Sequence, residues 1–169
     1  MTKASGTGPP DNKAQLVKHY LYPSALFASK EPTVVSTVLG TCVSVCLWDP
    51  YLKIGGINHY MLPLWNGEEL ASPKYGNIAI EKLIHAMLKL GANKKHLQAK
   101  VFGGKSEHEG KAQFYRIGER NVEIASSILA KENIPILAHS VGGGHGKKLE
   151  YYTATGEVYV HLVKPLANQ

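Results

Sequence analysis

The hydrophobic positions of this chain change period along its length, and each period predicts a different kind of element. Segments 33–39 and 43–49 are rich in β-branched residues and alternate side chains with a period of two, which is typical of strands. A third strand is expected at 54–62, joined to the second by a turn that contains Pro50. Between residues 76 and 90 the spacing becomes helical, with apolar side chains at Ile80, Leu83, Ile84, Met87 and Leu88.

The second half of the chain repeats this mixture of strands and helices. A strand is predicted at 98–102, a helix near 119–132, a strand at 135–141, and a closing hairpin whose strands KLEYYT and EVYVHLV flank residues 154–156. Helices interspersed among hairpin-linked strands favour mixed sheets covered by helices over a purely parallel, doubly wound sheet. The expected fold class is therefore mixed α/β, of the α+β kind.

The composition predicts one globular domain over residues 16–169, preceded by a disordered lead-in over residues 1–15. Of the 169 residues, 44% are hydrophobic and 19% are charged, which is enough to bury a core. The lead-in is rich in glycine, proline and polar residues. No apolar run approaches the length of a membrane span, and the N-terminus lacks the apolar core of a signal peptide. We therefore expect no membrane insertion and a cytoplasmic location.

The charge pattern argues against nucleic-acid binding. The formal net charge is +6, but the basic residues are scattered, with adjacent lysines only at 94–95 and 147–148. No basic stripe interleaved with aromatic residues is present in the sequence. We expect a mildly basic, solvated surface.

Both cysteines lie in the stretch TVLGTCVSVCLWDP, and strand geometry gives them separate roles. In a strand, the spacing of Cys42 and Cys46 spans about 13 Å, too far for a disulfide or for one zinc ion. Cys46 lies mid-strand among apolar neighbours and is expected to be a core residue. Cys42 follows Gly40 and Thr41, where a turn can expose the sulfur and direct backbone N–H groups at a bound molecule.

Among eight histidines, His59 is the one that geometry favours as a base for Cys42. If the second and third predicted strands form a hairpin through residues 50–53, residue 44 lies opposite His59. Cys42 then shares that face, diagonal to the imidazole at a Cβ separation of about 7 Å. A bulge at Gly55–Gly56 would place the two directly opposite. An imidazole that accepts the thiol proton yields a thiolate able to attack a carbonyl carbon.

A third polar group usually orients such an imidazole, and the preceding strand offers two hydroxyls. Ser36 and Thr37 are both available, and they point to opposite faces. On these residues alone, a structural histidine beside a buried cysteine is the alternative to a catalytic pair. A metal-binding module that uses Cys42, His59 and a further histidine is disfavoured, because no ligand pair has standard zinc spacing.

Several separate motifs occur in an order that resembles one family. The segments YLYPSALFAS, STVLGTCVSVCLWDP and GGINHYMLP are followed by FGGK, IGERN, VGGGHGKK and TGEV, over residues 18–163. In this combination the chain resembles the CheD family of chemoreceptor glutamine deamidases, whose members carry LGSCV and a downstream NH-x-MLP segment. The resemblance implies a layered sandwich of mixed β-sheets flanked by helices, related to the cytotoxic necrotizing factor cysteine hydrolases.

The resemblance also implies an activity and the residues that perform it. The family nucleophile corresponds to Cys42, and the histidine of the MLP segment corresponds to His59. The hydroxyl residue six positions before the cysteine, usually threonine in the family, is Ser36 here, and Gly40 and Thr41 would support the turn and the oxyanion. The implied reaction converts glutamine side chains of methyl-accepting chemotaxis receptors to glutamate through a cysteine thioester, with no cofactor and no metal.

Further implications of the resemblance concern partners and neighbouring motifs. The family pairs with a CheC-type phosphatase, so a non-catalytic regulator that binds this phosphatase is the alternative function. Hydrolysis of receptor glutamyl methyl esters would use the same acyl-enzyme and is a side activity to expect. Among the other motifs, FGGK is interpreted as a turn at a strand end, where glycine permits positive φ, and VGGGHGKK as a loop that borders the active site.

Overall fold

The computed structural model describes residues 16–106 and 116–164, so the predicted lead-in over residues 1–15 lies outside the described residues. Within the described ranges the chain forms nine strands, two α-helices and one short 3₁₀ helix. In chain order they are β1 (Val17–Tyr20), β2 (Leu26–Ser29), β3 (Thr33–Leu39), β4 (Val43–Asp49), β5 (Ile54–Asn58), α1 (Gly76–Lys89), η1 (Lys94–His96), β6 (Gln98–Gly103), α2 (Ile117–Lys131), β7 (Ile136–Val141), β8 (Gly146–Tyr152) and β9 (Val158–Val163).

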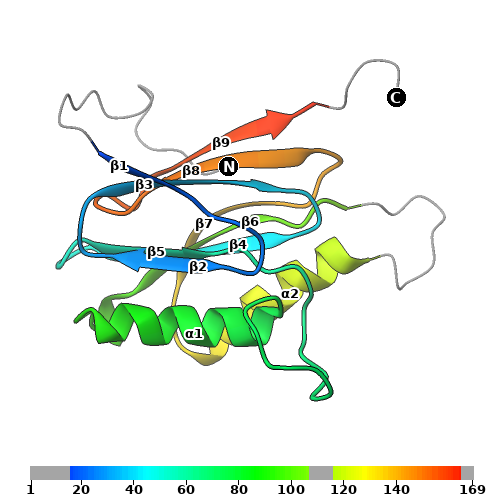
Figure 1. Cartoon of the computed structure of the whole chain (residues 1–169), viewed down its shortest axis with the longest axis horizontal. Coiled ribbons are helices and arrows are strands. Elements are labelled where there is room, and N and C mark those ends of the chain that lie inside the picture. Colours follow the sequence, from blue (N-terminus) through cyan, green and yellow to red (C-terminus); the bar gives the residue numbers. More distant parts are fainter. Residues whose placement is uncertain (1–15, 107–115, 165–169) are drawn as a thin grey trace.

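The strands form two mixed sheets that stack on one another (Figure 1). One sheet has the order β1-β3-β8-β9 and the other has the order β2-β5-β4-β6-β7. The pairs β1–β3 and β6–β7 are parallel, and the remaining pairs are antiparallel. The predicted mixed α/β class is therefore confirmed, whereas the short first strand was not predicted.

Both helices lie on the outer face of the five-stranded sheet, so this sheet is covered on two sides (Figure 1). Four of the five predicted apolar positions, Ile80, Leu83, Ile84 and Met87, form the inner face of α1 and pack in one cluster with side chains of β4 and β6. The fifth, Leu88, is 39% exposed. The expectation of helices flanking the sheets holds for this one side. Among the described elements, no helix covers the outer face of the four-stranded sheet.

A second hydrophobic cluster fills the space between the two sheets. It explains the alternation in β3, where Val35, Thr37 and Leu39 are buried toward the other sheet while the intervening residues are less buried. Cys46 of β4 belongs to this cluster and is 2% exposed, which confirms its predicted place in the core. The site described below lies at one end of this layer.

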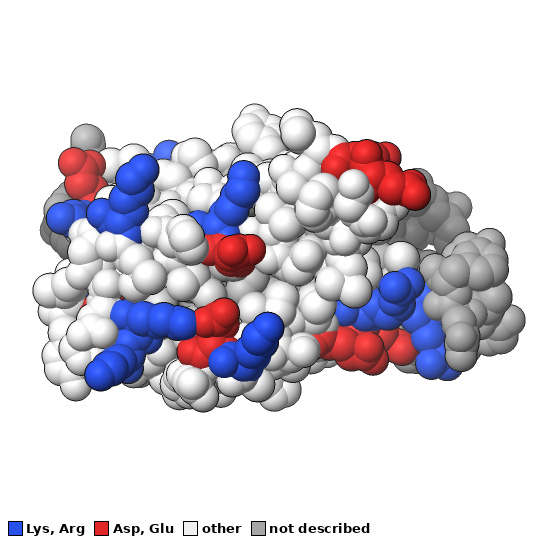
Figure 2. All heavy atoms as spheres, turned by 90° about the horizontal axis from the view of Figure 1, so that it is seen from below, with Lys and Arg blue, Asp and Glu red and all other residues white. Residues whose placement is uncertain are grey.

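The helical face of the molecule carries charges of both signs. Figure 2 views this face and shows lysine and arginine side chains interspersed with aspartate and glutamate, without a field of one sign. This pattern agrees with a solvated surface on that side. Neither α1 nor α2 combines the length and the apolar character that a membrane crossing requires.

Candidate active site

The hairpin of β4 and β5 sets His59 relative to Cys42. Asp49 pairs with Ile54, and the same register continues to a bridge between Val43 and Tyr60, so no bulge interrupts it. This pairing confirms the predicted register. It places Ser44 against His59 and leaves Cys42 one diagonal step along the neighbouring strand, at a bend formed by residues 40 and 41.

His59 reaches across the layer between the sheets to Thr37. The Thr37 hydroxyl oxygen lies 2.7 Å from His59 Nδ1, and the same hydroxyl donates its proton to the Leu21 carbonyl at 2.8 Å. A hydroxyl has one proton, so with that proton on Leu21 it can only accept from Nδ1–H. This assignment gives the tautomer with Nδ1 protonated and leaves the lone pair on Nε2. The orientation suits a general base.

The hydroxyl that contacts the imidazole belongs to Thr37 and not to Ser36, the residue expected from the family resemblance. Ser36 pairs with Tyr20 and Glu150 in the four-stranded sheet, and its side chain points to the opposite face of β3 from Thr37. The Ser36 hydroxyl therefore faces away from the imidazole that Thr37 contacts. Position 36 thus carries serine where the family that the chain resembles usually has threonine, and the next position carries threonine.

Burial determines the charge of His59. The residue is 2% exposed, and this desolvation lowers the pKa of its imidazole to about 4. The ring is thus neutral at pH 7. Its Nε2 atom is buried and has no hydrogen-bond partner among the described residues. This buried acceptor therefore keeps a lone pair that a proton donor can use.

Cys42 is half-buried, and its side chain packs against the cluster between the sheets. Burial raises the pKa of the Cys42 thiol, and a hydrogen bond from the residue's own backbone N–H offsets part of that rise. The sulfur therefore carries its proton at neutral pH and requires a base to become a nucleophile. Both cysteines are free thiols, and burial holds the pKa of Cys46 far above its ordinary value.

The backbone of the bend before β4 is held in place by partners from distant parts of the sequence. Gly104 donates its N–H to the Cys42 carbonyl at 2.9 Å, and Lys105 donates to the Gly40 carbonyl at 2.9 Å. The amide of Asn121 donates to the Thr41 carbonyl at 3.0 Å. Three successive carbonyl oxygens are thus fixed, while the described residues provide no backbone acceptor for the N–H groups of Thr41 and Cys42.

The FGGK turn makes this support possible. Gly103 has a φ of +105° and Gly104 a φ of +66°, which confirms the expected positive φ in this motif. A Cβ atom on Gly103 would collide with the Cys42 carbonyl oxygen, and one on Gly118 of α2 would collide with the Lys105 carbonyl oxygen. The bend at residues 40–42, the turn after β6 and the start of α2 therefore pack backbone against backbone. Gly40 has neither a positive φ nor a crowded Cβ position.

The sequence did not reveal Asn121 as part of the site. Its only signal was the IGERN segment, which entered through the family resemblance and carries no recognisable chemistry. The residue lies 80 positions from Thr41, and the contact joins a side chain to a backbone carbonyl. Such a contact places no restriction on the partner's residue type, so sequence patterns do not record it.

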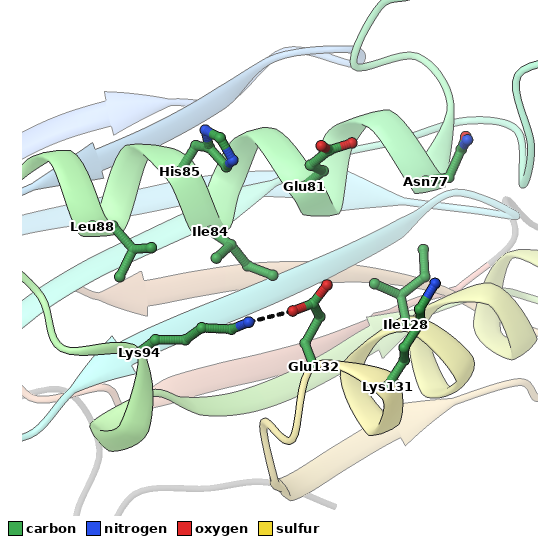
Figure 3. A pocket seen from close by; sticks show the side chains of 9 residues that line it. All are labelled: Asn77, Glu81, Ile84, His85, Leu88, Lys94, Ile128, Lys131 and Glu132. Carbon is green, nitrogen blue, oxygen red and sulfur yellow. Dashed lines mark hydrogen bonds and ion pairs between the residues drawn. The ribbon is translucent and has the colours of Figure 1, made fainter.

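A cavity on the helical side of the molecule lies away from Cys42. A cavity of about 430 Å³ separates α1 from α2, and an ion pair between Lys94 and Glu132 closes one side of it (Figure 3). Its lining includes no residue of the bend, of β3 or of β5. Within residues 16–106 and 116–164, no three histidine, cysteine or acidic side chains gather as metal ligands.

Comparisons with known proteins agree with the resemblance. A family model described as CheD, chemotactic sensory transduction, matches residues 61–162. A Sulfurimonas denitrificans protein named "Probable chemoreceptor glutamine deamidase CheD" is 47% identical over 148 residues, covering 87% of this chain and 95% of the relative. A Trichlorobacter lovleyi protein of the same name is 48% identical, covering 83% and 88%.

More distant similarities were also found. A Stenotrophomonas maltophilia protein with the same name is 41% identical, covering 89% of this chain and 75% of the relative. A solved structure of a Neisseria meningitidis protein from family DUF152 matches with a TM-score of 0.44 and 12% identity, covering 76% of this chain and 63% of that one. The family model spans more than half of the chain, and the two relatives with 47% and 48% identity align over most of it. The chain therefore belongs to the CheD family.

Proposed function

We propose that this protein is a cysteine hydrolase that deamidates glutamine side chains of methyl-accepting chemoreceptors. The observation that carries the proposal is the contact between Thr37 and His59 Nδ1, which leaves a buried, unpaired Nε2 lone pair on the layer that Cys42 also faces. The names of the relatives supply the substrate class. We assign Cys42 as nucleophile, His59 as general base and acid, and Thr37 as the group that orients the imidazole.

The first half of the reaction forms a thioester. His59 Nε2 takes the proton from the Cys42 thiol as the sulfur attacks the carbonyl carbon of the glutamine amide. Negative charge develops on the carbonyl oxygen, next to the N–H groups of Cys42 and Thr41. When this intermediate collapses, the carbon–nitrogen bond breaks and the imidazolium returns its proton to the leaving nitrogen, which departs as ammonia.

The second half consumes water. Neutral His59 accepts a proton from a water molecule while the oxygen attacks the thioester carbon. Collapse breaks the carbon–sulfur bond and releases a glutamate side chain, and the proton on the imidazole restores the thiol of Cys42. Neither step needs a cofactor, and the resting pair of thiol and imidazole is uncharged, which suits its burial.

The test uses a purified chemoreceptor fragment and intact-mass and peptide mass spectrometry. Wild-type protein is expected to convert specific glutamines to glutamates, each seen as the mass gain of exchanging an amide NH₂ for OH. Cys42→Ala should abolish conversion, whereas the matched Cys46→Ala should retain it because that thiol is a core residue. Conversion by Cys42→Ala at the wild-type rate would refute the assignment.

Further properties follow from the family resemblance and belong to the same proposal. They are a fold related to the cytotoxic necrotizing factor hydrolases, a cytoplasmic location, a CheC-type phosphatase as partner and hydrolysis of receptor methyl esters. A methyl ester would form the same thioester with Cys42 and release methanol instead of ammonia. A receptor fragment that carries methylated glutamates tests this activity with the same Cys42→Ala control.

A further inference from the structure

One side chain of α2 touches both segments that carry the proposed chemistry. Asn121 is fully buried, and its Nδ2 donates to the Thr41 carbonyl and to the Met61 carbonyl, each at 3.0 Å. Thr41 directly precedes the nucleophile Cys42, and Met61 follows the base His59 by two residues. A single amide therefore links the bend of the nucleophile to the segment that follows β5 and carries the base.

The two contacts fix the orientation of the Asn121 amide. Carbonyl oxygens accept hydrogen bonds, so only the NH₂ end can face Thr41 and Met61. The Oδ1 atom is buried and has no partner among the described residues. A side chain that leaves its own acceptor unpaired while using both donors is retained at a cost in stability, which indicates that the two donors have a role. Its helix is held separately, because the Tyr60 hydroxyl donates to the Asn121 backbone carbonyl at 2.6 Å.

Peptide geometry transmits the position of Asn121 to the nucleophile. In a trans peptide, the C=O of one residue and the N–H of the next point in opposite directions. Asn121 holds the Thr41 oxygen on the side of α2, so the N–H of Cys42 points away from the helix, to the side of the layer between the sheets. The Cys42 side chain packs on that same layer. The N–H and the sulfur thus converge where a substrate carbonyl would bind.

We propose that Asn121 is a positioning residue of acyl transfer, which holds the Thr41–Cys42 peptide so that the Cys42 N–H stabilises the oxyanion. The inference rests on the proposed role of Cys42 as nucleophile. It does not require that a chemoreceptor is the substrate. Asn121 acts through the peptide and does not contact the reacting atoms itself.

The test compares two reactions of Cys42 in the intact protein. Acylation by p-nitrophenyl acetate passes through a tetrahedral oxyanion, whereas alkylation by iodoacetamide displaces iodide and forms none. Both reagents consume the same thiolate, so the ratio of the two rates cancels changes in the ionisation or exposure of the sulfur. The rates are followed by mass spectrometry, with Cys42→Ala as the blank. Receptor deamidation by wild-type protein is measured in parallel, so a failure of the proposed substrate is seen separately.

Asn121→Ala is expected to lower the ratio of acylation to alkylation by at least about tenfold, because the oxyanion donor is no longer held. The matched variant Tyr60→Phe removes a buried hydrogen bond from the same cluster but leaves the amide contacts in place, so its ratio should stay within about twofold of wild type. A wild-type ratio in Asn121→Ala would overturn the proposal. An equal fall of the acylation and alkylation rates in Asn121→Ala would also overturn it. A fall of the ratio in Tyr60→Phe as large as the fall in Asn121→Ala would do the same.

A second variant covers the case in which Asn121→Ala does not fold. Asn121→Asp keeps the size of the side chain but replaces both donors by a carboxylate, which regains one O–H donor when it is protonated. Its ratio should be low at about pH 8 and recover as the pH falls to about 5, because a buried carboxyl titrates above its ordinary range. A ratio like that of wild type at the higher pH, or a low ratio without recovery, would refute the role of Asn121.

Discussion

Replacing Thr37 by valine tests the geometry of the proposed site most directly. Valine has nearly the shape of threonine, so Thr37→Val removes the hydroxyl without opening a cavity. The change leaves the Leu21 carbonyl and the Nδ1–H group of His59 without their partner in a buried place. Each unpaired buried group costs about 1–3 kcal/mol of folding free energy, so for two groups we expect a loss of about 2–6 kcal/mol in the free energy of unfolding.

The effect of Thr37→Val on rate follows from the charge that His59 acquires. During the reaction the neutral ring becomes an imidazolium, and its Nδ1–H then donates a charge-assisted hydrogen bond to Thr37. Hydrogen bonds to charged groups contribute about 1.5–3 kcal/mol, which corresponds to a rate roughly 10- to 150-fold lower when the acceptor is absent. Deamidation of a receptor fragment under saturating conditions measures this rate, and urea unfolding measures the stability.

Two neighbouring variants make the result specific. Thr37→Ser keeps a hydroxyl at the same position and should restore most of the activity. Ser36→Ala changes the adjacent hydroxyl, which points to the opposite face of β3, and should leave the rate near that of wild type. A loss in Ser36→Ala that equals or exceeds the loss in Thr37→Val would refute the assignment of the third residue.

Three further predictions concern stability and reactivity. His59 has a pKa of 6.5 when exposed and about 4 in the fold, so the unfolded chain binds more protons between these values. The free energy of unfolding should fall by up to about 3 kcal/mol as the pH drops from 6.5 to 4, and a His59→Gln variant should lack this part of the slope in urea titrations. Gly103→Ala should lower the free energy of unfolding by several kcal/mol and abolish most of the activity, because the φ of Gly103 is +105° and an added Cβ would collide with the Cys42 carbonyl oxygen. Gly144 has open space around it, so Gly144→Ala should have the melting temperature of wild type in thermal unfolding. Iodoacetamide should label Cys42 but not Cys46 in the folded protein, and equal labelling of both in mass spectra would contradict the described burial.

The sequence predicted the parts of the site that depend on neighbouring strands. The register of β4 against β5 follows from a short turn and from the alternation of side chains, so the diagonal relation of Cys42 and His59 was predicted correctly. The choice between Ser36 and Thr37 depends on a different contact. Their strand belongs to the other sheet, and the face that it turns to His59 is set by how two sheets stack. The period-two pattern of β3 shows that one face is buried but does not say against which residues.

The contacts that hold the bend at residues 40–42 could not be predicted from sequence patterns. Gly104, Lys105 and Asn121 donate hydrogen bonds to carbonyl oxygens, which every residue has, so the bend itself carries no complementary signal. The glycines were interpreted correctly as a turn with positive φ, yet the purpose of that turn became visible only with the backbone of residues 40–42 beside it. Strand β1 was missed for another reason. Its four residues are largely exposed and lack the apolar alternation that marks the other strands.

A hydroxyl in the third position gives this site a different resting state from one with a carboxylate. A carboxylate beside Nδ1 would raise the pKa of the imidazole and favour an ion pair of imidazolium and thiolate before substrate binds. Thr37 fixes the same tautomer without adding charge, so burial alone governs the pKa of His59 and keeps both partners neutral. In the proposed mechanism, the thiolate forms only as the sulfur attacks, when the backbone N–H groups stabilise the charge that appears on the substrate. A neutral thiol also reacts slowly with electrophiles and oxidants that reach the surface, so the resting site is protected from them.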